Sequence, residues 1–254
     1  MTASVSHQDL DALFREKYTG GRGWGPRMRR RFGYFNPDDH YEALLARLVT
    51  TDTVWLDVGC GRGLFPSYPQ QARRLATRCR KLVGIDPSPN VHDNPFVHES
   101  VQGTLGTYDP GRAFDLITCR MVAEHVEDPG AFAADLARLA RPGARLVIYT
   151  VHRWSPAALL ARLTPFEWHH PLKERIWDCQ QRDTFPVCMR LNTRRAIGSA
   201  FASAGFREES FRSLPDCRTF GNFRRILWLD LMAWRILGKL YPEKCLIGVY
   251  QREG

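Results

Sequence analysis

The segment from Val54 to Gly63 reads VWLDVGCGRG and decides which fold we expect. Its first three residues are apolar and favour β structure, so they predict a short buried strand that ends at Asp57. Gly59, Gly61 and Gly63 follow at every second position. Glycines let the backbone turn sharply and approach a ligand without an intervening Cβ. In open α/β sheets, ligands bind at this place, beyond the carboxyl ends of the strands.

A second acidic strand end supports this interpretation. Leu82 to Pro89 reads LVGIDPSP, and its acid, Asp86, lies about 20 residues beyond the glycine loop, the spacing at which a carboxylate binds ribose hydroxyls. The loop differs from a dinucleotide-binding loop, because Leu64 stands at the sixth position, where that loop has glycine. The alternative is an acid that only caps a helix behind a core strand.

Hydrophobic periodicity and turn residues divide the chain into alternating elements, which favours a parallel sheet. We expect helices over 9–18, 38–49, 69–79 and 131–140. We expect strands over 54–56, 81–85, 97–101, 113–119 and 144–151. Segment 19–37 is rich in glycine and aromatic residues and predicts a loop or lid. Asp38 is the expected cap of its helix, and the turn at 141–143 is expected to end the helix before it.

These motifs resemble those of the class I S-adenosylmethionine (SAM) methyltransferases. FDLITCRMVAEHVEDP, at 114–129, is similar to the family's fourth motif, and LARLARPGARLVIYT, at 136–150, to its helix, turn and fifth strand. The resemblance covers 53–150 and resumes at 192–206, which looks like the last helix of the family. It implies SAM as cofactor and S-adenosylhomocysteine as product.

The resemblance also implies an α/β, Rossmann-like fold. Its seven-stranded, mostly parallel sheet has helices on both faces and the strand order 3-2-1-4-5-7-6, and segments 206–214 and 245–251 suit its closing hairpin. Residues 1–50 would form a helical N-terminal cap or lid, and 51–254 the SAM-binding domain. Two inserts, at 154–190 and 218–242, lie outside the family pattern. Helical spacing in the second favours a packing or dimer helix over a membrane anchor.

Composition narrows the function classes. The 254 residues carry a net charge of +9, which permits nucleic-acid binding, although the arginines are spread along the chain. The dense basic cluster Arg27 to Arg31 suits a solvated patch, nucleic acid, an anionic acceptor or the SAM carboxylate. There is no apolar run long enough to span a membrane and no signal-peptide core. Seven cysteines without a Cys-x-x-Cys pair indicate neither metal nor disulfides, so we expect a cytoplasmic protein.

The predicted cofactor site combines both acidic strand ends with the loops beside them. Relatives usually have an acid near the adenine amino group, where this chain has Thr104, whose hydroxyl can still accept a hydrogen bond. The predicted cofactor contacts are Tyr18, Asp57, Gly59, Gly61, Gly63, Asp86, Pro87, Thr104, Leu105 and Cys119.

Methyl transfer from SAM is an in-line displacement that requires a positioned nucleophile and exclusion of water. A general base helps when the acceptor is a hydroxyl, and histidine suits neutral pH. The predicted catalytic residues are His125, His152 and His169. The predicted acceptor contacts are Tyr34, Arg120, Trp154, His170 and Arg190. For each of these residues, ordinary packing or surface exposure is the alternative.

We therefore expect a methyltransferase that acts on a small molecule, at oxygen first and then at nitrogen or sulfur, as a monomer or homodimer without a metal. An RNA or other macromolecule methyltransferase is one alternative. Against a base-methylating enzyme, residues 119–122 read CRMV, and not the Asn/Asp-Pro-Pro-Tyr type of motif. A non-catalytic SAM-fold binding protein is the other alternative, and the intact glycine loop with Asp86 argues against it.

Overall fold

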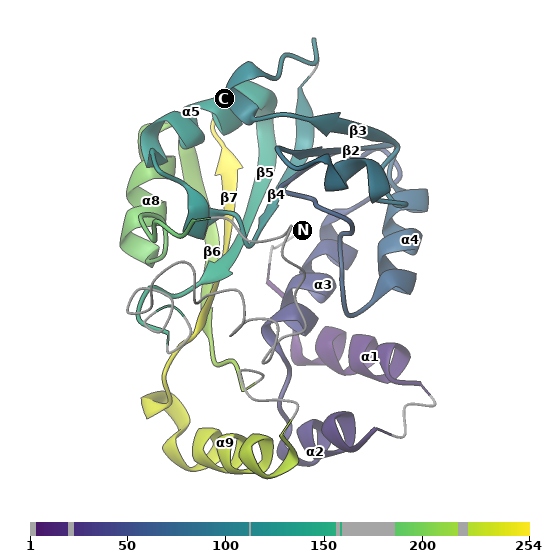
Figure 1. Ribbon diagram of the computed structural model, residues 1–254, viewed down its shortest axis with the longest axis vertical. Coiled ribbons are helices and arrows are strands. Elements are labelled where there is room, and N and C mark those ends of the chain that lie inside the picture. Colours follow the sequence, from purple (N-terminus) through teal and green to yellow (C-terminus); the bar gives the residue numbers. More distant parts are fainter. Residues whose placement is uncertain (1–3, 20–22, 112, 156–157, 159–185, 218–222) are drawn as a thin grey trace.

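The computed structural model describes residues 4–19, 23–111, 113–155, 158, 186–217 and 223–254. Seven strands form one sheet in the order β3-β2-β1-β4-β5-β7-β6, as the sequence predicts (Figure 1). Only β7 runs antiparallel to its neighbours. The strands are β1 (Val54–Val58), β2 (Lys81–Asp86), β3 (Glu99–Gln102), β4 (Phe114–Arg120), β5 (Ala140–Val151), β6 (Phe206–Leu214) and β7 (Cys245–Arg252).

Helices cover both faces of the sheet, also as predicted (Figure 1). The α-helices are α1 (His7–Lys17), α2 (Trp24–Phe32), α3 (Pro37–Leu48), α4 (Pro69–Arg78), α5 (Pro129–Leu139), α8 (Arg194–Ser203) and α9 (Arg224–Leu237). The short 3-10 turns are η1 (Pro89–Asp93), η2 (Leu105–Thr107), η3 (Ala123–His125) and η5 (Gly238–Leu240).

β1 lies inside the sheet, between β2 and β4, and all five of its residues are buried. Successive side chains of a strand point to opposite faces. Trp55 accordingly packs in a core cluster with residues of α1, α3 and α4, whereas Leu56 packs in a second cluster with residues of α5 and α8. Because β2 and β4 pair with β1 in parallel, the carboxyl ends of all three strands meet at one edge. The glycine loop follows β1 at this edge.

Three expectations about local structure were wrong. The predicted loop at 19–37 contains α2, which ends at a left-handed Gly33. α3 is capped by Asn36, with Pro37 in its first turn, and not by Asp38. Proline suits the first helical position because its fixed φ is helical and its missing N–H would have no helical partner there. Finally, β5 begins at Ala140, four residues before the expected start, because Ala140 pairs with Phe114 across a register shift.

A third core cluster joins α2 to α9. Its buried members are Phe32, Tyr34, Cys217, Leu227, Leu231 and Tyr241. The chain leaves the sheet at the end of β6 and returns at the start of β7, where Leu214 pairs with Cys245. Cys245 also pairs with Val151, the last residue of β5, so α9 stands off the carboxyl edge of the sheet. We call α2 and α9 together the α2–α9 layer; they lie side by side at the bottom of Figure 1.

Candidate active site

The glycine loop has the backbone that its sequence predicts. Gly59 and Gly61 have φ values of 66° and 45°, in the left-handed region that favours glycine. A Cβ on Gly59 would lie 2.3 Å from Cγ2 of Val122, so the loop passes directly over the chain that follows β4. A Cβ on Gly61 would meet nothing within 4 Å, which leaves space for a ligand above the backbone.

Asp86 is placed beside this loop, as its spacing predicts. Its side chain is buried, and Oδ2 accepts a hydrogen bond of 2.9 Å from the Gly61 backbone N–H. Its other oxygen, Oδ1, accepts one of 2.8 Å from the Ser88 N–H. The carboxylate therefore joins the loops after β1 and β2, and each oxygen keeps a further lone pair for a hydroxyl donor.

Asp57 is a buried acid at the end of β1. The Thr118 hydroxyl donates a hydrogen bond of 2.5 Å to its Oδ1, and that hydroxyl accepts one of 2.7 Å from the Trp55 indole. Burial raises the pKa of Asp57 to about 7, although the Thr118 hydrogen bond and the nearby Arg120 charge act in the opposite direction. The side chain can thus change its protonation state near neutral pH.

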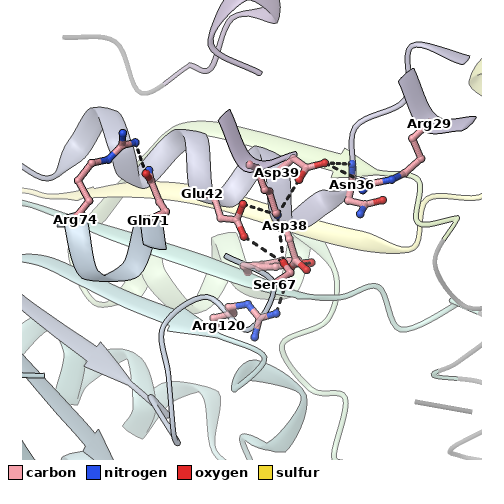
Figure 2. A network of polar contacts seen from close by, with 11 residues as sticks. Arg29, Asn36, Asp38, Asp39, Glu42, Ser67, Gln71, Arg74 and Arg120 are labelled. Atoms are coloured by element: carbon pink, nitrogen blue, oxygen red, sulfur yellow. Dashed lines mark hydrogen bonds and ion pairs between the residues drawn. The ribbon is translucent and has the colours of Figure 1, made fainter. Parts of the chain in front are cut away.

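Arg120 connects the end of β4 to the N-terminal helices. Its guanidinium donates to Asp38 Oδ1 at 3.2 Å, and the Tyr149 hydroxyl donates to the same oxygen at 3.0 Å (Figure 2). The guanidinium also lies over the Tyr149 ring, 5.6 Å from its centroid. Burial is the largest single influence on the pKa of Arg120 and lowers it, but the Asp38 charge and hydrogen bond, together with Tyr149 and Tyr41, outweigh it, and the net shift is upward. A fixed cation therefore lies at the carboxyl edge, where β4 and β5 end.

A buried ion network joins the three N-terminal helices (Figure 2). The Lys17 ammonium lies 2.9 Å from Asp39 Oδ1 and 2.6 Å from Glu42 Oε2, and all three side chains are at most 2% exposed. Arg29 contacts the other oxygen of Asp39 at 3.2 Å. Two cations thus face two carboxylates, which offsets the cost of burying their charges.

Burial has different outcomes for two members of this network. It raises the pKa of Glu42 to about 7, against the opposing effect of the Lys17 charge. It lowers the pKa of Lys17, but the Asp39 and Glu42 carboxylates outweigh it, so the net shift is upward. The ammonium therefore stays charged, and its charge holds α1 against α3.

The Glu-His-Val segment after β4 is fixed by buried hydrogen bonds. Glu124 is buried and accepts a hydrogen bond of 2.8 Å from Thr150, whose hydroxyl in turn accepts one of 2.8 Å from Asn192. His125 Nδ1 lies 2.6 Å from the Pro186 carbonyl oxygen. Because a carbonyl only accepts, Nδ1 carries the proton, and Nε2 is the nitrogen that can take a proton from a substrate.

The other predicted cofactor contacts differ in exposure. Leu105 and Cys119 are buried in the core, whereas Pro87 and Thr104 are exposed. Tyr18 is half-buried, and the Arg29 guanidinium lies over its ring, 4.8 Å from the centroid. The structure therefore brings Asp57, the glycine loop and Asp86 to one edge, and the role of each in cofactor binding stays a prediction.

Among the described residues, the predicted acceptor contacts Tyr34, Trp154 and Arg190 have separate surroundings. The Tyr34 hydroxyl donates to the Pro215 carbonyl and accepts from the Cys217 N–H, so it belongs to the third core cluster. Trp154 is 59% exposed, and Arg190 is exposed and donates to the Glu127 carbonyl. His152 follows β5, and its Nδ1 accepts a hydrogen bond from the Trp154 N–H. His169 and His170 lie outside the described residues, as does most of the predicted insert at 154–190.

Sequence reasoning missed two features of this edge. A Cβ on Gly84 would lie 2.6 Å from Cys60 Sγ, so β2 needs glycine there to let the loop pack against it; a glycine inside the LVGID strand was the available signal. Met121 has a φ of 53°, which is uncommon for a residue with a side chain. No sequence pattern marks that position.

The described residues contain neither a cluster of metal ligands nor a helix that could span a membrane. Within the ranges that the structure describes, no group of three or more His, Cys, Asp or Glu side chains is arranged to hold a metal ion. No helix in that part of the chain has the length and apolar character needed to cross a membrane.

Comparison with known proteins decides the family. A methyltransferase-domain family matches residues 28–210, which is most of the chain. The chain belongs to this family. The resemblance to class I SAM methyltransferases is thereby confirmed, and SAM is the cofactor that this family and its fold support.

The curated relatives match part of the chain. A ubiquinone biosynthesis O-methyltransferase of Xanthomonas axonopodis pv. citri is 30% identical over 148 residues, which are 51% of this chain and 59% of that protein. One from Rhodopseudomonas palustris is 33% identical over 113 residues, which are 41% of this chain and 42% of that protein. The chain thus spans between two fifths and three fifths of the length of these two relatives.

Solved structures show the same fold at low identity. The N-methyltransferase NodS from Bradyrhizobium japonicum WM9, in complex with S-adenosylhomocysteine, has a TM-score of 0.50 and 15% identity, covering 97% of this chain and 99% of that one. A geranyl diphosphate C-methyltransferase from Streptomyces coelicolor A3(2) has a TM-score of 0.51 and 15% identity, covering 84% and 77%. Because these proteins are named for nitrogen and carbon acceptors, the fold alone does not identify the acceptor atom.

Proposed function

We propose that this protein transfers the methyl group of SAM to a hydroxyl oxygen of a small molecule. The observation that carries the proposal is the buried Asp86 carboxylate, which accepts a hydrogen bond from the Gly61 N–H at the carboxyl edge of the sheet. The chain that forms this sheet belongs to the methyltransferase-domain family. The preference for oxygen is supported by the relatives named ubiquinone biosynthesis O-methyltransferase.

The residues at this edge fit SAM. The open space over Gly61 would take the cofactor against the backbone, with Asp86 accepting from the ribose hydroxyls. Thr104 and Leu105, at the start of η2, would contact the adenine, and Asp57 would face the polar part of the cofactor. The sulfonium of SAM supplies an electrophilic methyl group, so the protein has to position the acceptor in line with it and exclude water.

His125 is the base that we assign for a hydroxyl acceptor. Its Nδ1 proton is directed at the Pro186 carbonyl, and we assign the removal of the hydroxyl proton to Nε2. The fixed charge of Arg120 would stabilise an anionic part of the acceptor or the oxygen as it loses its proton. His152, Trp154 and Arg190 stay candidates for acceptor contact, together with His169, His170 and Tyr34. Residues 1–50 would close over this site as a cap, with the two inserts beside it.

The remaining expectations concern the protein's setting. A cytoplasmic location and a monomeric or homodimeric state stay predictions. We favour a small-molecule acceptor over nucleic acid because residues 119–122 read CRMV, and not the Asn/Asp-Pro-Pro-Tyr type of motif that base-methylating enzymes carry there.

The test is an assay for S-adenosylhomocysteine with a panel of small molecules bearing hydroxyl, amine or thiol groups, followed by mass spectrometry of the product. We expect an O-methylated product, and no turnover with Asp86→Ala at a SAM concentration that saturates the wild type. His125→Gln should lower kcat and leave SAM affinity unchanged. Exclusive N- or S-methylation would reject the oxygen assignment. SAM binding without turnover of any acceptor would favour the binding-protein alternative.

A further inference from the structure

The outer face of α9 is apolar although it faces away from the core. Leu227 and Leu231, four residues apart, are the buried side chains that hold the helix against its neighbours. Leu229 and Ile236 lie seven residues apart on roughly the opposite side, and they are 57% and 74% exposed. Phe223, Trp228, Leu237 and Leu240 extend this exposed set around the helix and beyond its end.

Exposed arginines lie on α2 and at the start of α9. α2 lies beside α9 (Figure 1) and contributes Arg27, Arg30 and Arg31, and the start of α9 contributes Arg224 and Arg225. Within the described residues, no ion pair engages any of these five side chains. The face is therefore both apolar and strongly positive.

A surface groove lies where the two helices meet. It has a volume of about 510 Å³ and is lined by Trp24, Arg224, Arg225, Trp228 and Leu229. Indole rings with aliphatic neighbours would accept acyl chains, and the two guanidinium groups would bind phosphate or carboxylate oxygens. Tryptophan and arginine are the residues that proteins concentrate where hydrocarbon meets charged headgroups.

We propose that the α2–α9 layer docks on a membrane surface that contains anionic lipids. The exposed apolar side chains would insert at the level of the headgroups, with the arginines pairing with lipid charges around them. A second copy of this chain fits less well, because a two-fold interface would bring the two sets of five arginines together. α9 is too short to span a bilayer, so the contact lies in the plane of the surface.

The location of this face relates it to the rest of the molecule. The α2–α9 layer stands off the same edge of the sheet as the glycine loop, because α9 leaves β6 and enters β7 at that edge. A bound membrane would thus lie beyond the carboxyl edge of the sheet. The docking proposal itself does not depend on the proposed function, since it rests only on the exposed side chains.

The test is flotation of the purified 254-residue chain with two kinds of vesicle. One contains phosphatidylcholine alone, and the other contains phosphatidylcholine with about 30 mol% of the anionic lipid phosphatidylglycerol. We expect binding to the anionic vesicles that decreases steeply in high salt. Leu229→Gln combined with Ile236→Gln should remove most of it. Arg224→Glu with Arg225→Glu should weaken it by about twenty-five-fold, since each arginine contributes about fivefold.

The matched control is Arg73→Glu with Arg195→Glu, which changes the net charge equally at exposed positions of α4 and α8. It should bind vesicles within about threefold of the wild type, given only long-range screening effects. Thermal unfolding of each variant checks that the fold is kept. Absence of wild-type binding, or equal losses in the control and the α9 variants, would overturn the proposal. A dimer in solution that Leu229→Gln and Ile236→Gln dissociate, without vesicle binding, would assign the face to a second copy.

Discussion

The cofactor edge and the α2–α9 layer are built in different ways, although both stand at the same end of the sheet. We call the carboxyl edge that carries the glycine loop and Asp86 the cofactor edge, after the role proposed for it. Its decisive contact joins Gly61 to Asp86, only 25 residues apart; Gly61 lies three residues after β1, and Asp86 is the last residue of β2. In the third core cluster, which joins α2 to α9, the Tyr34 hydroxyl bonds to residues 181 and 183 positions away. Local backbone geometry thus forms the first region, and side-chain packing between distant segments forms the second.

This difference predicts how the two regions respond to substitution. Changes at the cofactor edge should damage the backbone path or cofactor affinity. Changes in the α2–α9 layer should lower stability while leaving cofactor binding unchanged, because the layer has its own core cluster.

The largest effect is expected from Gly59→Ala. The new Cβ would meet Val122 at 2.3 Å in a left-handed backbone conformation, so we expect a loss of about 3 kcal/mol in the free energy of unfolding. Urea denaturation measures it. The matched control is Gly61→Ala, where no neighbour lies within 4 Å and only the strain of φ remains, about 1 kcal/mol. Val122→Ala should recover part of the loss in the double variant, and equal losses at both glycines would refute the assigned contact.

The next effect concerns cofactor affinity. Asp86→Asn should weaken SAM binding by roughly tenfold to a hundredfold, since it replaces charge-assisted hydrogen bonds with neutral ones. Isothermal titration calorimetry measures the change. Asp52→Asn, at an exposed carboxylate in the turn before β1, is the control and should bind SAM as the wild type does. Unchanged affinity in Asp86→Asn would move the cofactor away from this acid.

A smaller effect tests the second region. Tyr34→Phe would leave the Cys217 N–H without its acceptor in a buried place, at a cost of about 1–2 kcal/mol in the free energy of unfolding. We expect SAM affinity to stay unchanged. If the KM for the methyl acceptor rises more than the loss of folded protein can explain, the result would instead support a contact between Tyr34 and the methyl acceptor.

The last effect is a change in how stability depends on pH, and it is tested at Asp57. Because burial raises its pKa to about 7, the folded state holds a proton that the unfolded state has released. Stability from this group is fully present below its unfolded pKa, near 4 or so, and is lost as pH rises toward about 7. Between these two pKa values, Asp57 lowers the free energy of unfolding by up to about 1.4 kcal/mol for each pH unit. Asp57→Asn should remove this part of the pH dependence. Denaturation at pH 5, 6, 7 and 8 checks it, and an identical slope in both proteins would contradict the assigned pKa.

Local sequence signals predicted the strands of the sheet and brought the glycine loop and Asp86 to one edge, as the structure has them. Strand periodicity and the paired acids, Asp57 and Asp86, are local signals, and the family resemblance added the strand order that the structure confirms. Strand ends and glycine turns can be read from a few neighbouring residues because their conformation depends on backbone sterics within that stretch. The helix at 24–32 escaped prediction because glycine, proline and four arginines conceal its period, and packing against α9 stabilises it.

Only the tertiary structure decided which distant side chains meet. Nothing in the order of residues places Lys17 between Asp39 and Glu42, or Arg120 against Asp38, 82 positions away. The close approach of Gly59 to Val122 and the exposed face of α9 likewise arise only when the sheet and the helices pack together. The physical reason is that burial, charge pairing and the resulting pKa shifts depend on neighbours in space, whereas a sequence pattern reports neighbours along the chain.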